Sequence, residues 1–380
     1  MQVRLLELQN ESDALQACAV AGRSVAGSNL RGWAALLPAE GPAAALREAG
    51  LAVLRGERHL LALGSLSSLW SAARSLAASL GEHRELAAVL RDRVAAVEEG
   101  PAPWALPRTA LARGRTLVMG VVNVTPDSFS DGGRFLDAGP AIEHGLQLAA
   151  EGADILDVGG ESTNPFGARP VEAAEERRRV EPVLRGLARQ ARTPLCIDTT
   201  KASVAQAALD LGAEIVNDVS GLARDPSMGN VVARARAAVC LMHMRGVPQD
   251  MQARATYVDL HGEVLAELEE ALRRARAAGI PDERCAIDPG LGFAKTASHS
   301  LLLLRRLREL TQLRLPVVVG ASRKSFIGRA TGRDPKDRLF GSIAAAAVAA
   351  VNGAAVVRVH DVAATQEAVR VADAVRTSTA

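Results

Sequence analysis

Polar and charged residues that could bind or transform a small molecule recur at the ends of the chain's short apolar segments. Eight such segments end in, or lead directly into, an acid, an amide, a histidine or a lysine, and a glycine or turn signal accompanies most of them. Carboxylates pair with adjacent N–H donors, amides serve donors and acceptors, and basic side chains hold anions. The segments are 116–124, 155–160, 195–199, 215–221, 239–244, 285–290, 316–322 and 356–361.

The first of these segments is the most informative. Seven of the nine residues from Thr116 are apolar or Gly, which is typical of a strand buried on both faces. The run breaks at Thr125-Pro126-Asp127 and enters a polar loop that ends in paired glycines at Gly133. A buried strand followed by a long polar loop is where a barrel enzyme keeps its catalytic groups.

The elements that must position these residues alternate between strand and helix. Amphipathic stretches with helical periodicity lie between the apolar segments, for example at 171–191, 202–212, 258–279 and 342–351. Eight strand–helix units over about 260 residues predict a (β/α)8 TIM barrel over 116–380. A doubly wound open sheet is the competing architecture, but it would concentrate its site at one switch point rather than around a ring.

The length of the chain predicts a second, smaller domain. The 380 residues exceed one barrel by about a hundred, and prolines at 101, 103 and 107 indicate a linker. We expect a small α/β accessory domain at 1–100 and a Pro-rich linker and lead-in at 101–115. Strands are predicted at 3–8 and 58–63, and helices at 12–21, 66–80 and 84–99. No motif identifies the role of this domain, and a structural or oligomer-stabilising one is expected.

Composition and charge indicate which partners and which compartment to expect. The net charge is +2 with both signs spread throughout, which predicts neither a nucleic-acid nor a membrane partner. The longest apolar run, 343–351, is too short to span a bilayer, and the N-terminus lacks the pattern of a secretory signal. The four cysteines have no metal-like spacing, so we expect a cytoplasmic protein with reduced thiols.

Lysine usage is unusual. The chain holds 45 basic residues but only four lysines, so nearly every positive charge is Arg. Three of the four, Lys201, Lys295 and Lys324, stand just past a predicted strand end. A chain that uses Arg by default and retains Lys there indicates that a compact ammonium group is needed.

Six strings of the barrel segment are irregular enough to be distinctive. They are N-V-T-P-D-S-F-S-D-G-G (123–133), D-V-G-G-E-S-T (157–163), N-D-V-S-G (217–221), D-P-G-L-G-F-A-K (288–295), S-R-K-S (322–325) and R-V-H-D (358–361). They closely resemble dihydropteroate synthase, in the order of that family, from about Thr116 to the C-terminus. The resemblance implies a transferase of folate biosynthesis that usually forms a homodimer. It would condense 6-hydroxymethyl-7,8-dihydropterin pyrophosphate with p-aminobenzoate, releasing 7,8-dihydropteroate and pyrophosphate with the help of Mg²⁺.

The resemblance also implies roles for individual residues. Catalytic roles fall to Asp198, Asp288, Lys324, Arg358 and His360. Asp198, Asn217 and Asp288 would line the pterin pocket, where Lys324 donates to the ring and Arg358 stacks on it, and Asn123 would hold Mg²⁺. Arg358, His360 and Thr163 would bind the diphosphate, and Phe293, Lys295 and Ser325 would complete the arylamine pocket under two loops that carry Asp127, Phe129, Asp131 and Ser162. Asp157 and Met242 are further substrate-binding positions.

The second loop departs from the family pattern, which commonly reads E-S-T-R-P-G. Asn164 stands where an Arg is expected, and Arg169 could supply the missing charge. Leu291 and Ala294 replace residues that are often Phe and Gly. Two alternatives stay open: a methyltransferase that uses a methylated pterin, and a catalytically idle pterin-binding protein. His243 has no support from a matched string and is expected in the core or at the rim.

Overall fold

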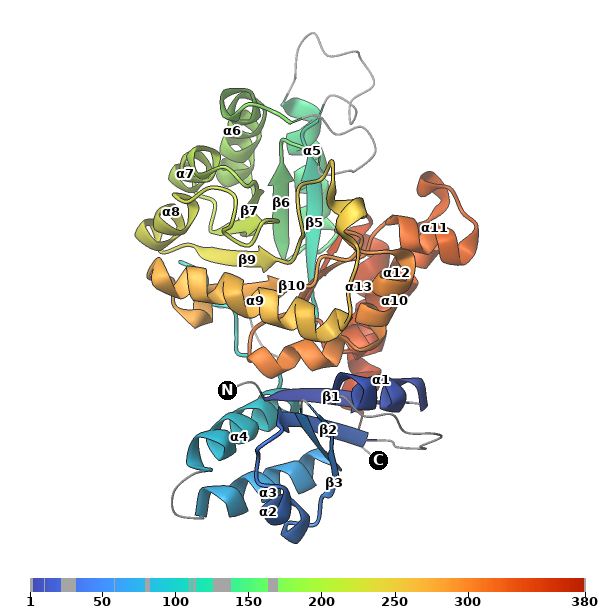
Figure 1. Cartoon of the computed structure of the whole chain (residues 1–380). Coiled ribbons are helices and arrows are strands. Elements are labelled where there is room, and N and C mark those ends of the chain that lie inside the picture. The colour runs from blue at the N-terminus through green and yellow to red at the C-terminus, as the bar shows by residue number, and fades with distance from the viewer. Residues whose placement is uncertain are drawn as a thin grey trace. The chain divides into compact units, whose positions relative to one another are not determined.

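The computed structural model describes residues 3–9, 11–21, 32–57, 59–78, 83–108, 111, 114–125, 138–162 and 170–378. Its contacts divide the chain into two compact units (Figure 1). One unit comprises Met1–Pro101 with Arg308–Arg314, and the other comprises Ala102–Leu307 with Leu315–Ala380.

The larger unit is the predicted TIM barrel. Its strands form one parallel sheet in the order β10-β9-β8-β7-β6-β5-β12-β11, and a parallel bridge between Ile287 and Val317 joins the two end strands. Neighbours in this order are neighbours in sequence except at β5–β12, so the doubly wound alternative is wrong. The strands are β5 (Leu117–Asn123), β6 (Ile155–Gly159), β7 (Leu195–Asp198), β8 (Ile215–Asp218), β9 (Ala238–Met242), β10 (Cys285–Asp288), β11 (Val318–Gly320) and β12 (Val356–Val359).

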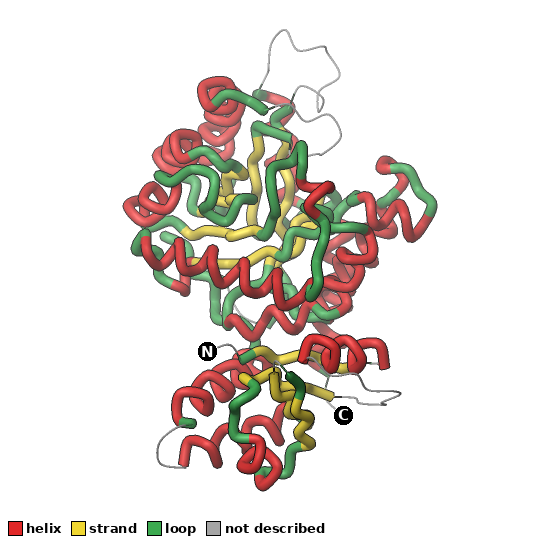
Figure 2. The backbone as a smooth tube through the Cα atoms, in the orientation of Figure 1, coloured by secondary structure: helices red, strands yellow, loops and turns green. Residues whose placement is uncertain are grey.

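Helices surround these strands (Figure 2). Four of them, α6, α7, α9 and α12, occupy the stretches where helical periodicity was predicted. The α-helices are α5 (Gly139–Ala150), α6 (Ala173–Gln190), α7 (Ala202–Asp210), α8 (Met228–Ala235), α9 (Leu260–Ala277), α10 (Ala297–Arg305), α11 (Ser325–Thr331), α12 (Leu339–Val351) and α13 (Val362–Thr377). Short 3-10 helices are η2 (Met251–Arg254), η3 (Asp282–Arg284), η4 (Leu307–Leu313) and η5 (Pro335–Asp337).

Alternation along the strands separates an apolar layer from a polar layer inside the barrel. The apolar layer is a buried cluster with at least one residue from every strand, among them Ile155, Cys196, Ala286, Val318 and Val356. Side chains on a strand alternate between faces, so the residue two positions further along also points inward. In seven strands that residue is Asp157, Asp198, Asn217, Met242, Asp288, Gly320 or Arg358, and all seven stand near the carboxyl ends.

The predicted linker closes the floor of the barrel. Trp104, Leu106 and Leu111 are buried in the same cluster as the apolar layer. The indole Nε1 of Trp104 donates to the carbonyl of Arg284 at 3.0 Å, which satisfies its only polar atom. This segment therefore belongs to the core of the barrel unit, and the apolar residues between its prolines are the sequence signal for that burial.

The smaller unit is an antiparallel sheet in the order β1-β2-β4-β3 with helices on both faces. One buried cluster includes residues of α3 and α4, and the other includes residues of α1. Beyond the predicted elements it contains β2, β3 and α2. The strands are β1 (Arg4–Leu8), β2 (Gly32–Pro38), β3 (Ala52–Arg55) and β4 (His59–Gly64), and the helices are α1 (Glu11–Ala21), α2 (Ala43–Glu48), α3 (Leu66–Ala78) and α4 (Arg84–Glu99).

Residues 308–314 complete this smaller unit although they follow α10 in sequence. The side-chain amide of Gln312 accepts from the backbone N–H of Leu5 at 3.0 Å and donates to its carbonyl at 3.2 Å. The carboxylate of Glu309 accepts from the N–H of Glu7 at 2.8 Å. Side chains thus satisfy the outer edge of β1, which would otherwise expose unpaired backbone groups.

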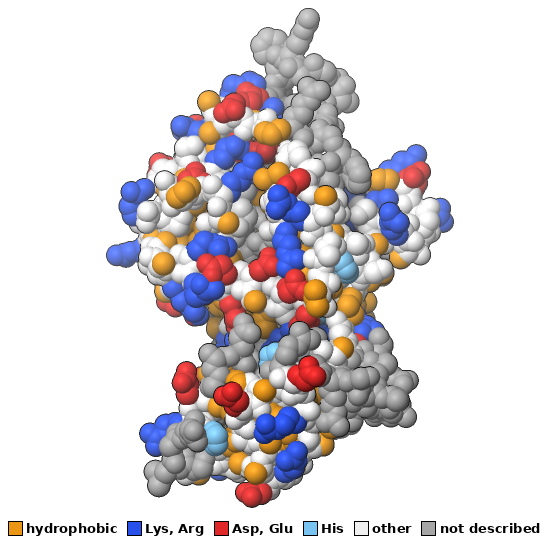
Figure 3. All heavy atoms as spheres, in the orientation of Figure 1, with side chains coloured by type: hydrophobic (Ala, Val, Ile, Leu, Met, Phe, Trp, Pro, Cys, Tyr) orange, Lys and Arg blue, Asp and Glu red, His pale blue; other side chains and the backbone are white. Residues whose placement is uncertain are grey.

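The distribution of surface charge agrees with the mixed signs of charge along the sequence. On the face shown in Figure 3, basic and acidic side chains are interspersed. No helix of the described residues is long and apolar enough to cross a membrane. All four cysteines are buried free thiols.

Candidate active site

Two acids clamp one arginine at the centre of the polar layer. Arg358 Nε donates to Asp157 Oδ2 at 2.5 Å, and Arg358 Nη2 donates to Asp198 Oδ2 at 2.8 Å. Burial alone would lower the pKa of Arg358, but Asp157 and Asp198 outweigh it and raise the pKa. Burial raises the pKa of Asp198 to about 7, although the nearby Arg358 opposes the shift. The guanidinium is therefore permanently charged and fixed in orientation.

A second acid and a lysine lie beside this arginine. A Cβ atom built on Gly320 would lie 3.8 Å from Lys324 Nζ, 4.0 Å from Asp288 Oδ2 and 4.0 Å from Arg358 Cβ. Groups from β10, β11 and β12 thus converge where Gly320 leaves room. Burial raises the pKa of Asp288 and lowers the pKa of Lys324 to about 8, and each group's charge partly reverses the shift of the other.

Lys324 and Asp288 are also held by backbone. Asp288 Oδ1 accepts from the N–H of Gly290 at 2.6 Å, and Lys324 Nζ donates to the carbonyl of Leu291. The Lys324 ammonium lies 4.4 Å from the centre of the Phe293 ring, a cation–π distance. The D-P-G-L-G-F loop and the S-R-K loop therefore form one wall of the barrel mouth, which is the opening at the carboxyl ends of the strands.

The N-D-V-S-G string divides into one site residue and one structural residue. Asn217 is 6% exposed and faces the interior. Asp218 faces the other way along the strand, and its oxygens accept from Ser220 N, Ser220 Oγ and Leu222 N. Asp218 thus holds the turn after β8, whereas Asn217 is available to a ligand with Met242, which is buried on the neighbouring strand.

His360 is oriented by Ser322, which follows β11. Its Nδ1 lies 3.0 Å from Ser322 Oγ. Burial, followed by the charge of Arg358, lowers the pKa of His360 to about 4, so the ring is neutral near pH 7. Arg323, at φ 59°, forms an ion pair with Asp361 at 2.7 Å, which joins the S-R-K and R-V-H-D segments. Sequence patterns gave no separate role to Arg323 or Asp361.

The other two lysines from the sequence pattern are engaged by the protein itself. Lys201 Nζ contacts both Glu161 and the fully buried Glu176, which stand on either side of the second loop. Lys295 is 2% exposed and its Nζ lies 2.8 Å from His243 Nδ1. His243 is thus buried and contacts Lys295. This agrees with the core or rim position expected for it.

The remaining predicted site residues either are exposed or lie outside the described residues. Asn123 ends β5 with an exposed side chain, and Ser325 is exposed at the start of α11. Asp127, Phe129, Asp131, Thr163, Asn164 and Arg169 lie outside the described residues, whereas Ser162 is exposed. Within the described ranges, no group of three or more His, Cys, Asp or Glu is gathered as an all-protein metal site. Mg²⁺ often keeps several waters and binds substrate phosphates, so the Asn123 amide oxygen fits it as a single protein ligand.

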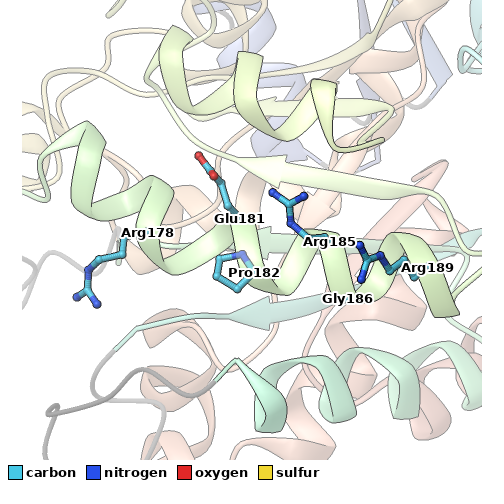
Figure 4. Close-up of a pocket in the computed structure, with 6 residues that line it drawn as sticks. All are labelled: Arg178, Glu181, Pro182, Arg185, Gly186 and Arg189. Carbon is cyan, nitrogen blue, oxygen red and sulfur yellow. The ribbon is translucent and has the colours of Figure 1, made fainter.

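A hollow of about 450 Å³ lies away from this mouth (Figure 4). It lies against α6 and is lined by Arg178, Glu181, Pro182, Arg185, Gly186 and Arg189. None of the inward-facing polar residues lines it, so it is separate from the candidate active site.

Comparison with known proteins agrees with this geometry. The family model described as "Pterin binding enzyme" matches residues 119–360. Dihydropteroate synthase of Synechocystis sp. is 45% identical over 276 residues, which cover 72% of this chain and 95% of the relative. A structure of the Xanthomonas albilineans enzyme with 4-aminobenzoic acid is 48% identical, covers 71% of this chain and 96% of its own, and superposes with a TM-score of 0.67. Another, with 7,8-dihydropteroate, is 45% identical with a TM-score of 0.64 and covers 71% and 97%.

The match spans the barrel unit, where all six strings of the sequence pattern lie. The chain therefore belongs to the dihydropteroate synthase family of pterin-binding TIM barrels, which is a family of transferases.

Proposed function

We propose that the barrel mouth condenses 6-hydroxymethyl-7,8-dihydropterin pyrophosphate with p-aminobenzoate. The observation that carries this proposal is the convergence of Asp288, Lys324 and Arg358 around Gly320, with Asp157 and Asp198 behind the guanidinium. This arrangement offers acceptors, donors and a flat cation to one ring, which suits a pterin. The Xanthomonas albilineans relative was solved with 4-aminobenzoic acid and with 7,8-dihydropteroate, which supports p-aminobenzoate as a substrate and 7,8-dihydropteroate as the product here.

Each inward-facing group has a role toward the pterin. The free oxygen of Asp288 accepts from the ring's adjacent N–H and amino donors, and the amide of Asn217 pairs with a donor and an acceptor. Lys324 donates to the ring oxygen or nitrogen, and the guanidinium of Arg358 stacks on the ring face because its acids fix its orientation. Asp198 supplies a further acceptor, and Met242 an apolar wall.

The reaction follows from these charges. The C–O bond between the pterin methylene and the diphosphate breaks, and its electron pair leaves with the diphosphate. The neutral arylamine nitrogen attacks the cationic methylene carbon and then loses one proton to solvent. Asp198, Asp288 and Asp157 favour the cation, while Arg358, His360 and Thr163 bind the departing diphosphate. Asn123 would hold Mg²⁺, which supplies further electrostatic stabilisation of that leaving group.

We propose that the arylamine lies between Phe293 and Ser325, next to the loops that carry Asp127 and Thr163. The arylamine is nucleophilic when neutral, so the mouth needs no strong general base. Burial lowers the pKa of His360 to about 4, which makes its imidazole a weak base and is consistent with this requirement. Asn164 in place of the family's Arg then affects arylamine affinity rather than the type of reaction.

The protein is further proposed to be a cytoplasmic homodimer that acts on small molecules rather than on nucleic acid or membranes. Large apolar side chains are exposed on two helices that pack against each other, α12 and α13. They are Phe340, Val348, Val351, Val371 and Val375, with exposed fractions of 82%, 45%, 43%, 65% and 61%. A second copy that covers this face would remove apolar surface from water. We assign the smaller unit a structural, oligomer-stabilising role.

The test is release of pyrophosphate by the purified protein with Mg²⁺, the pterin pyrophosphate and p-aminobenzoate, leaving out one component at a time. We expect release to require both substrates and to yield 7,8-dihydropteroate. Pterin binding without product would refute the synthase activity and favour an idle binding protein, and methyl transfer from a methylated pterin would favour the methyltransferase.

A further inference from the structure

A row of three side chains leads from α9 to the loop that follows β10. Glu267 Oε2 lies 3.0 Å from His243 Nε2, and His243 Nδ1 lies 2.8 Å from Lys295 Nζ. Lys295 also donates to the carbonyl of Phe293 at 2.9 Å. His243 and Lys295 are 4% and 2% exposed, whereas the Glu267 side chain is 41% exposed. The row therefore joins an acid at the surface to a buried ammonium.

The hydrogen-bonding capacity of each group gives the row a direction. An ammonium has donors and no acceptor, so Nδ1 of His243 accepts from Lys295. The ring proton of neutral His243 then lies on Nε2, the nitrogen that stands 3.0 Å from Glu267 Oε2. Burial, followed by the charge of Lys295, lowers the pKa of His243 to about 4, which keeps the ring neutral. Burial alone would raise the pKa of Glu267, but hydrogen bonds from His243 and Arg245 lower it to about 2.

Side chains hold the loop at the end of this row at four successive carbonyls. Each carbonyl from residue 291 to residue 294 accepts a hydrogen bond from a side chain; three of the donors lie in other segments, and the fourth, Lys295, lies in the loop itself. The pairs are Leu291 with Lys324, Gly292 with Gln252, Phe293 with Lys295 and Ala294 with Tyr257. Gly290, Gly292 and Ala294 have positive φ angles of 65°, 82° and 47°, so this irregular conformation depends on those donors.

The same loop begins at Asp288, and Lys295 acts on that acid electrostatically. Burial raises the pKa of Asp288, and Lys324, Lys295 and Arg358 are the charged side chains that lower it. Burial lowers the pKa of Lys295 itself to about 7. The charged and titratable groups that face Lys295 are Asp288, Lys324, Glu267, Arg245, His243 and His299.

We propose that Lys295 is a positioning residue for the pterin site, whose ammonium, held beside His243 and Glu267, fixes the Phe293 carbonyl and adds a positive charge to the surroundings of Asp288. This inference rests on the proposed role of Asp288 in binding the pterin. It also accounts for a lysine in a chain that otherwise uses arginine. The closed space between the imidazole and a backbone carbonyl suits a compact ammonium better than a planar guanidinium.

The experiment is a fluorescence titration of 6-hydroxymethylpterin at pH values from about 6 to about 8.5, with the wild type and three variants. Lys295→Met removes the charge, and Glu267→Gln removes the acid that supports it. Glu263→Gln is the matched control, because Glu263 also pairs with Arg245, at 2.7 Å, on the same helix, but is not part of the row.

Removal of a positive charge raises the pKa of Asp288, so binding should weaken as the pH falls. The loss for Lys295→Met should be largest at the acidic end of the range, and for a rise of one pKa unit it approaches about tenfold once the pH lies below the pKa of Asp288. Little change is expected near pH 8.5, because Lys295 in the wild type is itself mostly neutral there, with a pKa of about 7. Glu267→Gln should shift the profile in the same direction by a smaller factor, and Glu263→Gln should overlay the wild type.

Two results would overturn the proposal. One is an equal loss of affinity by Lys295→Met at every pH, which would indicate a purely structural contact. The other is a Glu267→Gln profile identical to that of Glu263→Gln; this comparison decides the matter if thermal unfolding shows that Lys295→Met does not fold. A wild type that fails to bind the pterin would refute the role of Asp288, and with it the role of Lys295.

Discussion

Replacement of Asp288 by Asn isolates the charge that the proposed pterin site depends on. Asp288 Oδ1 accepts from the N–H of Gly290 at 2.6 Å, and no hydrogen bond to its other oxygen occurs among the described residues. In the variant, the amide oxygen would take the Gly290 hydrogen bond, because that N–H needs an acceptor. The amide NH₂ would then stand where the free carboxylate oxygen stood and would face the pterin's own donors.

The size of the effect follows from this exchange. A hydrogen bond to a charged group contributes about 1.5–3 kcal/mol, and a buried donor left unpaired costs about 1–3 kcal/mol. Together they give about 2.5–6 kcal/mol, which corresponds to a loss of pterin affinity of about 60-fold or more. Asp288 also raises the pKa of Lys324, so its loss should lower that pKa below about 8 and move the alkaline limb of kcat/KM to lower pH.

The assay is titration of 6-hydroxymethylpterin, together with the pH profile of product formation. Asp218→Asn is the control, because Asp218 is an equally buried acid at a strand end whose oxygens serve the β8 turn. It should lower stability and leave pterin affinity nearly unchanged. An Asp288→Asn protein that binds the pterin within about threefold of the wild type would refute the assignment, since that is under 1 kcal/mol.

Three further predictions concern stability and assembly. Trp104→Ala should cost about 3–5 kcal/mol in the free energy of unfolding, measured by denaturant titration, because the indole is 2% exposed in the barrel floor. Arg236→Gly should raise stability by about 0.5–1 kcal/mol in the same assay, because Arg236 ends α8 at φ 52°, in the left-handed conformation that glycine adopts freely. Phe340→Asp should convert the proposed dimer to a monomer in sedimentation velocity, and an unchanged sedimentation coefficient would argue against the α12–α13 interface.

The barrel could be predicted because the signal for it is local and repeated. A strand that is buried on both faces reads as an apolar run, and the polar residue at its end interrupts that run at each of the eight positions. Period-two alternation also separates Asn217, which faces inward, from Asp218, which holds a turn. The string N-D-V-S-G alone presents two adjacent polar residues, so the strand register decides between them.

Other features could not be predicted because they depend on residues far apart in sequence. Gln312 satisfies the edge of β1 from a segment 307 residues away, and no local pattern marks either partner. The lysine pattern placed Lys201 and Lys295 in the loops that follow β7 and β10, but it did not identify their partners. Glu176 and Glu267 lie on helices, where acids are usually solvated, so their contacts with Lys201 and His243 emerge only when the helices pack on the sheet.

Residues that stabilise the barrel and residues proposed to bind the pterin occupy different layers of the same strands. Two of the variants above test this division. The apolar layer and Trp104 bury side chains that carry no charge, whereas the polar layer two residues further along keeps charged groups whose burial shifts their pKa values. Burial of Asp288 and Lys324 opposes their ionisation. For Asp288 it is offset by Lys324, the Gly290 N–H, Lys295 and Arg358, and for Lys324 by Asp288 and Asp198. Loss of Trp104 should therefore lower the free energy of unfolding while the folded fraction still binds the pterin. Loss of the Asp288 charge should abolish binding with little effect on stability, or even increase it, because a buried charge is removed.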